Sequence, residues 1–313
     1  MAHITFVHGL ANKPSPEELI QRWRSAISKA VYPLDLGAES ISCEMVYWAD
    51  VLYEKPLSDN DFETFIINEA LEIPESPPAL SFNGKNEDED MWIAAMSDRL
   101  GLNHEIVQPI EIIKPSPNKT MANDMERIPL PGFVKDELMR TFLRDLHHYL
   151  FNAASKPRLG SAFNVQEEIR RRFVRAIEIG KAKPGPHIVI SHSMGTVIAY
   201  DCLKRVKECP PIDGLITIGS PLGIDEIQDK FKPEWTRRDG FPSNNVRTTW
   251  LNIYDPLDAV SILDSAISND FKKKNVSVIE DIPQSNSGVW RHDVEKYLMG
   301  SEVSAAIGKL LEV

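Results

Sequence analysis

The sequence of 313 residues is poor in cysteine and in positive charge, and it has no long apolar run. Its three cysteines, Cys43, Cys202 and Cys209, are far from any Cys-x-x-Cys spacing, which argues against a disulfide framework or a zinc cluster and favours a reducing compartment. Thirty-five basic residues face 46 acidic ones, and the formal charge of −11 argues against nucleic acid as a partner. No run of 18 apolar residues occurs, so no stable membrane insertion is expected.

The common signatures of cofactor and metal sites are also missing. No Walker loop, dinucleotide GxGxxG, HExxH or EF-hand pattern occurs at a suitable spacing. The neighbouring residues His147 and His148 would diverge by about 100° on a helix, which does not suit a shared metal ion. We therefore expect neither a cofactor nor a metal. The amino-terminal stretch MAHITFVHGL does not resemble a secretory signal, so a soluble, cytoplasmic protein is expected.

Short apolar strands alternate with amphipathic helices along most of the chain. A capping box that starts at Ser15, with Pro16 at the first helical position, predicts the first helix. The alternation favours an α/β fold with a mostly parallel central sheet covered by helices on both faces. The predicted strands are 4–7, 42–49, 187–191, 214–219, 248–255 and 276–282, and the later helices are 165–179, 195–207 and about 303–311.

The stretch from about residue 51 to 160 does not follow this alternation. It has little strand signal, and prolines and acidic residues separate its helical pieces, such as the apolar stripe of Leu138, Phe142 and Leu146. We therefore predict a core of residues 1–50 and 161–313 with a mostly helical cap inserted at 51–160. The stripes hold the insertion together or line a substrate pocket, and these two interpretations are compatible. The acidic run at 87–90 is predicted to be a solvated turn.

A serine between small residues stands at one predicted corner between strand and helix. The strand 187–191 runs into the sequence SHSMG at 191–195, and a helical pattern follows. This arrangement is typical of a nucleophile elbow, in which the tight corner needs small neighbours and the helix N-terminus points at the serine. Ser193 is therefore the candidate nucleophile, although Ser191 stands where the usual pattern has a glycine.

With this elbow the sequence resembles the α/β-hydrolase superfamily, and within it the lipase-like branch. The other matching segments are FVHGL at 6–10, TIGSPLG at 217–223, NIYDPLD at 252–258, and His292. The elbow and the segment 219–223 look most like intracellular phospholipase and glycosylphosphatidylinositol-deacylase relatives. The resemblance covers about two thirds of the chain, and it implies the α/β-hydrolase fold with a nucleophile, acid and histidine in that order.

The nucleophile needs a histidine base and an acid, because serine alone reacts poorly at neutral pH. Of eight histidines, His292 lies after the last predicted strand, where the superfamily has its base. Two acids compete, because Asp255 and Asp258 both follow the strand 248–255. Asp258 is favoured because the residues after it match the superfamily pattern better, and Asp255 precedes a proline as turn aspartates often do.

A tetrahedral intermediate also needs two hydrogen-bond donors for its oxyanion. The resemblance places them at the backbone amides of Leu10, after the His-Gly turn, and Met194, after the nucleophile. His8 is expected to order the oxyanion turn, and His192 to pack behind the elbow.

Together these residues predict a serine hydrolase that cleaves carboxylic esters through an acyl-enzyme. The resemblance and an apolar insertion incline the prediction toward lipid or medium-to-long acyl esters. An acyltransferase, thioesterase or amidase with the same triad stays open, as does a protein of the same fold that binds an acyl ligand without catalysis. The sequence makes no prediction of oligomeric state.

Overall fold

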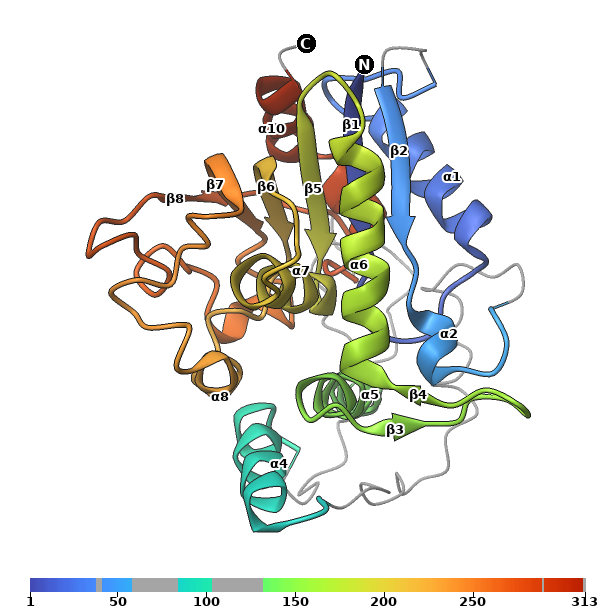
Figure 1. The fold of residues 1–313 in the computed structure, drawn as a ribbon, viewed down its shortest axis with the longest axis vertical. Helices are drawn as coiled ribbons and strands as arrows, with labels where there is room; N and C mark the ends of the chain where they lie inside the picture. The colour runs from blue at the N-terminus through green and yellow to red at the C-terminus, as the bar shows by residue number, and fades with distance from the viewer. Residues whose placement is uncertain (38–40, 58–83, 103–131, 289, 312–313) are drawn as a thin grey trace, which may run out of the picture.

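The computed structural model describes residues 1–37, 41–57, 84–102, 132–288 and 290–311. Its centre is a six-stranded sheet with the order β2-β1-β5-β6-β7-β8, in which every neighbouring pair is parallel (Figure 1). The predicted α/β class and parallel sheet are therefore confirmed. The strands are β1 (Ala2–Val7), β2 (Ile41–Val46), β5 (His187–His192), β6 (Ile212–Ile218), β7 (Val246–Tyr254) and β8 (Ile279–Pro283).

Helices cover both faces of this sheet, which is why successive strand residues are apolar on both sides. Phe6 and Ile190 belong to one apolar cluster, whereas their neighbours Val7 and Val189 belong to a second cluster on the opposite face. The first face packs against α1 (Pro16–Ser28), α9 (Val294–Met299) and α10 (Ser301–Leu311). The second packs against α6 (Val165–Lys181) and α7 (Met194–Arg205), which cross in front of the strands in Figure 1.

The first helix begins where its capping residues predict. Ser15 Oγ accepts the Glu18 amide N–H at 3.2 Å, and Pro16 occupies the first turn, where its missing N–H costs nothing. Trp23 and Ile27 are buried one turn apart, so the apolar stripe of α1 faces the sheet.

The described part of the predicted insertion lies beyond the carboxyl ends of the strands in Figure 1. It contains α4 (Glu87–Arg99), α5 (Gly132–Leu150) and β3 (Ala154–Ser155). The strand β3 pairs antiparallel with β4 (Phe163–Asn164), which follows the predicted boundary at residue 160. The α5 stripe of Leu138, Phe142 and Leu146 is buried in the same apolar cluster as α6 and α7. Residues 58–83 and 103–131 lie outside the described residues, and the division into core and cap stays a prediction. The remaining short elements are α2 (Ala49–Leu52), α8 (Asp225–Gln228) and the 3₁₀ turns Asp229–Phe231 and Ser261–Leu263.

The prediction of a turn at residues 87–90 is wrong, although Glu87, Asp88 and Asp90 are exposed to solvent as expected. These four acidic residues form the first turn of α4, and the Asn86 side chain caps it by accepting the Glu89 amide N–H at 3.0 Å. Carboxylates are favoured there because the helix N-terminus carries partial positive charge. Glu89 is only 6% exposed and contacts His147 Nε2 at 3.1 Å, so this acidic residue packs inward.

Candidate active site

The predicted site residues all follow the carboxyl ends of strands. Leu10 follows β1, Ser193 follows β5, Asp258 follows β7 and His292 follows β8. Parallel strands end at one edge of a sheet, so side chains from distant parts of the chain gather at that edge.

Ser193 occupies the corner between β5 and α7 with φ 54° and ψ −128°. Positive φ is unusual for a residue with a side chain, and it persists where the surroundings hold it. The Ser193 amide N–H donates to the Ile218 carbonyl at 3.0 Å, and the Thr196 hydroxyl donates to the Ser193 carbonyl at 2.7 Å. The corner therefore holds Ser193 at the start of α7, where the helix favours negative charge.

Two glycines allow the turn after β1 to approach this corner. A Cβ atom on Gly9 would lie 2.8 Å from the Cβ of Ser193, and one on Gly195 would lie 2.5 Å from the Val7 carbonyl oxygen. Both distances are too short for a real side chain, so these positions need glycine. The close approach places Leu10, which follows Gly9, and Met194 on chain segments that both touch Ser193.

His292 and Asp258 form a buried pair. His292 Nδ1 lies 2.7 Å from Asp258 Oδ2, and the two residues are 3% and 0% exposed. An ionised carboxylate can only accept, so Nδ1 carries a proton and Nε2 is the ring nitrogen that can act as a base. Burial opposes ionisation of Asp258, but His292, the Val260 amide and the Tyr297 hydroxyl outweigh it and lower the pKa of Asp258.

The two atoms that a proton transfer would join are both buried. Neither Ser193 Oγ nor His292 Nε2 has a hydrogen-bond partner among the described residues. Both residues lie next to Gly219. The Ser193 amide N–H donates to the carbonyl of Ile218, the residue before Gly219, and a Cβ on Gly219 would lie 3.1 Å from the His292 ring. A hydroxyl donor and an imidazole acceptor are chemically complementary.

The alternative acid, Asp255, is occupied elsewhere. It is completely buried, and it holds the loops after β7 and β8 together as the partner of Arg291. The structure therefore brings Asp258, not Asp255, to His292. The Asp255 carboxylate accepts hydrogen bonds from the amides of Leu257 and Asn286 and from Arg291 Nε at 2.8, 2.6 and 2.9 Å.

Tyr297 is a site residue that the sequence analysis missed. Its hydroxyl donates to Asp258 Oδ2 at 2.8 Å and accepts the Asp255 amide N–H at 2.8 Å. Burial, followed by the charge of Asp258, raises the pKa of Tyr297 well above 10, so the hydroxyl keeps its proton. The one sequence signal is its place in the short helix directly after His292.

His8 fixes the turn that carries Leu10. His8 Nδ1 donates to the Gly9 carbonyl at 2.9 Å, and Nε2 accepts the Trp48 amide N–H at 3.0 Å. The ring stacks on Trp48, and burial lowers the pKa of His8 well below 6.5, so the ring is neutral. The C=O and N–H of a trans peptide point in opposite directions, so the bond to Gly9 fixes the direction of the Leu10 N–H.

The backbone amide of Met194 is the second predicted donor for the oxyanion. It is the first residue of α7, and first-turn amides have no acceptor inside their own helix.

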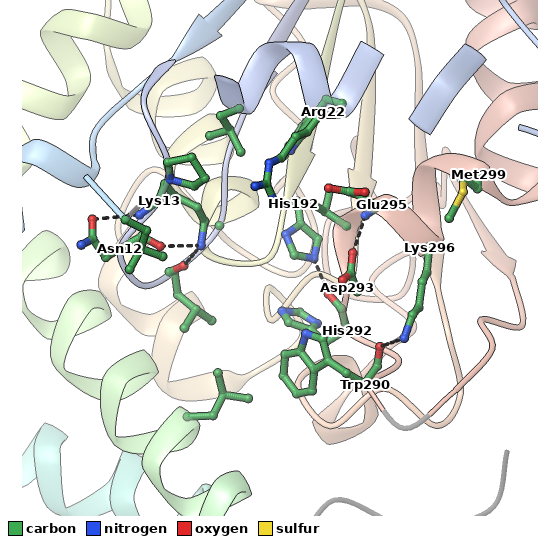
Figure 2. A pocket seen from close by; sticks show the side chains of 18 residues that line it. Asn12, Lys13, Arg22, His192, Trp290, His292, Asp293, Glu295, Lys296 and Met299 are labelled. Atoms are coloured by element: carbon green, nitrogen blue, oxygen red, sulfur yellow. Dashed lines mark hydrogen bonds between the residues drawn. The ribbon is translucent and has the colours of Figure 1, made fainter. Parts of the chain in front are cut away.

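A cavity of about 250 Å³ lies against this site (Figure 2). His292 and His192 face it, and the His192 Nε2–H donates to the His292 carbonyl at 2.9 Å. Burial lowers the pKa of His192 well below 6.5, so the His192 ring is neutral. Ser193 and Met194 are fully buried just outside the lining. The other lining residues include Gly9, Leu10, Leu19, Trp23, Leu57, Leu138, Trp290 and Met299, with Lys13, Arg22, Asp293, Glu295 and Lys296.

Neither a metal site nor a membrane span was found in the described part of the chain. No group of three or more His, Cys, Asp or Glu side chains there is arranged to hold a metal ion. None of the helices in those residues combines the length and the apolar character that a bilayer crossing requires.

Comparison of the sequence with models of known families and with curated proteins found no match. The function is therefore inferred from the residues around Ser193.

Proposed function

We propose that the protein is a serine hydrolase that cleaves carboxylic esters through Ser193, His292 and Asp258. The observation that carries this proposal is the His292–Asp258 contact of 2.7 Å beside a serine held at φ 54° at a helix N-terminus. We further propose an α/β-hydrolase fold of the lipase-like type with residues 51–160 as its cap. The order Ser193, Asp258, His292 along the chain supports this assignment.

In the proposed reaction His292 Nε2 takes the proton of Ser193 Oγ as the oxygen attacks the ester carbonyl. The amides of Leu10 and Met194 donate to the oxyanion that forms. The intermediate then collapses, His292 returns the proton to the departing alkoxide, and an alcohol leaves the acyl-enzyme. Water activated by His292 repeats these steps and releases the acid. Asp258 keeps the proton on Nδ1 and stabilises the imidazolium.

The cavity supports an acyl ester as the substrate, of lipid or medium-to-long acyl type. Trp23, Leu138 and Trp290 offer apolar walls to an acyl chain, while charged residues at other positions suit a polar alcohol portion. An ester carbonyl beside Gly9 and His292 would border Ser193, because both residues touch the elbow or its neighbour Gly219. A cytoplasmic location stays a prediction from the sequence.

A fluorophosphonate probe tests the activated serine without knowledge of the natural substrate. We expect labelling of Ser193 alone, identified by mass spectrometry, and its loss in Ser193→Ala and His292→Ala. Ser191→Ala is the matched control, since Ser191 is also buried but its hydroxyl donates to the Ile216 carbonyl, and labelling should persist. Folded wild-type protein that does not react would overturn the proposal and favour a non-catalytic acyl-binding role.

Product analysis then separates hydrolysis from acyl transfer. Esters of increasing acyl length are supplied with a competing alcohol or thiol. A hydrolase releases free acid whatever acceptor is added, whereas a transferase forms the new ester or thioester.

A further inference from the structure

Asp145 on α5 is bonded to the turn that carries Leu10. Its side chain is completely buried, and Oδ2 accepts the Ala11 amide N–H at 2.9 Å across 134 positions of sequence. Ala11 has φ 66°, a conformation that a residue with a Cβ rarely adopts without outside support. The Asp145 carboxylate is such a support, and it comes from a helix far from the triad in sequence.

Leu10 lies between two peptide groups that are both held. On its amino side, His8 bonds to the Gly9 carbonyl, which sets the direction of the Leu10 N–H. On its carboxyl side, Lys13 Nζ bonds to the Leu10 carbonyl, and Asp145 accepts from the Ala11 N–H of the same peptide. The direction of the Leu10 amide therefore depends on Asp145 as well as on His8.

The Asp145 carboxylate is itself held in one orientation. The Tyr53 hydroxyl donates to Oδ2 at 2.8 Å, and Arg144 Nη2 donates to Oδ1 at 2.8 Å. A buried charge needs such partners, and these leave the carboxylate no freedom to turn away from Ala11. Asp145 is not among the residues that line the cavity.

We propose that Asp145 is a positioning residue for the oxyanion site, acting through the Ala11 amide on the Leu10 N–H. This inference rests on the proposed esterase function. Without the carboxylate the Leu10–Ala11 peptide keeps only the bond from Lys13 and gains freedom to rotate. The Gly9–Leu10 peptide meets it at the Leu10 Cα, so the Leu10 N–H is then held by His8 alone and points less steadily at the developing oxyanion. Because Asp145 does not line the cavity, its loss affects the transition state more than substrate binding, which lowers kcat and leaves KM unchanged.

The test compares Asp145→Leu with Asp201→Leu in the full-length protein. Asp201 on α7 is equally buried and similarly bonded, to the Tyr149 hydroxyl at 2.6 Å and Arg170 Nε at 2.7 Å. Complete loss of one oxyanion donor costs about 10² to 10³ in rate, so Asp145→Leu should lower kcat about 10- to 100-fold with KM within about threefold. Asp201→Leu should lower the thermal midpoint and leave kcat unchanged.

Two milder substitutions, with Tyr149→Phe as their control, keep the test decisive where the leucine variants do not fold. Asp145→Asn retains a carbonyl oxygen for the Ala11 N–H and should recover kcat to within about threefold of wild type. Tyr53→Phe should lower kcat about two- to fivefold, while Tyr149→Phe, which removes the matching bond to Asp201, should not. Equal kcat in the Asp145 and Asp201 variants, or a change in KM alone, would overturn the inference. Failure of Ser193 labelling in wild type would instead remove the proposed function.

Discussion

Tyr297 donates a hydrogen bond of 2.8 Å to Oδ2 of Asp258, the same carboxylate oxygen that accepts the His292 Nδ1–H at 2.7 Å. The shared oxygen means that the carboxylate is positioned by α9 as well as by its own loop. The same hydroxyl also accepts the Asp255 amide N–H, so one side chain joins both candidate acids.

Replacement of Tyr297 by phenylalanine should reduce both activity and stability. Asp258 loses one of its donors and gains freedom to rotate, so kcat should fall about 3- to 10-fold, and the free energy of unfolding should fall by about 1–3 kcal/mol. Ester hydrolysis and urea unfolding measure the two effects. Tyr200→Phe is the control, because that buried hydroxyl donates to the Gly240 carbonyl at 2.7 Å and does not contact Asp258. Equal kcat in the two variants would contradict a role for Tyr297 at the acid.

Replacement of each candidate acid by asparagine should have different effects on kcat and on stability. Asp258→Asn removes the acceptor that fixes the His292 tautomer, and the corresponding change in a serine protease lowers kcat about 10⁴-fold. Asp255→Asn breaks a buried ion pair with Arg291 and should cost about 3–5 kcal/mol of stability, with a much smaller loss of kcat at a temperature where the variant is folded. Steady-state rates and unfolding curves for both variants decide this, and the reverse pattern would move the acid to Asp255.

Local sequence patterns predicted the six strands of the sheet and the strand ends after which the candidate residues lie. Periodicity and capping depend on neighbours within one or two turns, so β5, α7 and the start of α1 at Pro16 could be predicted from the residues themselves. The sequence also indicated that Ser193, Asp258 and His292 would lie at one edge of the sheet, because each follows a strand and parallel strands end at the same edge.

The contacts that orient these residues could not be predicted in this way. Tyr297 contacts Asp258 across 39 positions of sequence, and Asp145 contacts Ala11 across 134. No local sequence pattern predicts a contact between residues so far apart. The prediction for the acidic run at 87–90 failed at Glu89 for a related reason. The Asn86 cap places Glu89 in the first turn of α4. The burial of Glu89 against His147, however, depends on how α4 packs on α5.

Gly219 should tolerate no side chain. It has φ 54°, and a Cβ would lie 3.0 Å from Asp258 Oδ2 and 3.1 Å from the His292 ring. Gly219→Ala should therefore cost about 1–2 kcal/mol in backbone strain and displace the pair enough to lower kcat at least about 10-fold. Gly101→Ala is the matched control, because Gly101 has φ 73° with no atom within 4 Å of an added Cβ. It should lose similar stability and keep its kcat, and equal activity losses would show that strain alone is responsible.

Two histidines at the other end of the sheet should make the protein sensitive to acid. His3 and His187 are paired on neighbouring strands with ring centroids 4.9 Å apart. Burial, with a smaller contribution from Lys183 at His3 and from His3 at His187, lowers the pKa of each histidine from 6.5 to about 4. Between pH 6.5 and 4 the unfolded chain therefore binds protons that the folded chain does not. Stability is fully present above pH 6.5 and is lost as the pH falls, by about 1–3 kcal/mol for each histidine.

Urea unfolding at pH 7 and pH 4.5 measures this loss, and a double variant isolates it from other titrating groups. His3 bonds to Ser42 through Nδ1 and His187 bonds to Thr5 through Nε2, so His3→Asn and His187→Gln place an amide near each bonded atom without a titrating ring. The double variant should lose clearly less stability between the two pH values than wild type does, because neutral amides bind no proton in either state. An identical loss in both proteins would show that carboxylates, and not this histidine pair, set the acid sensitivity.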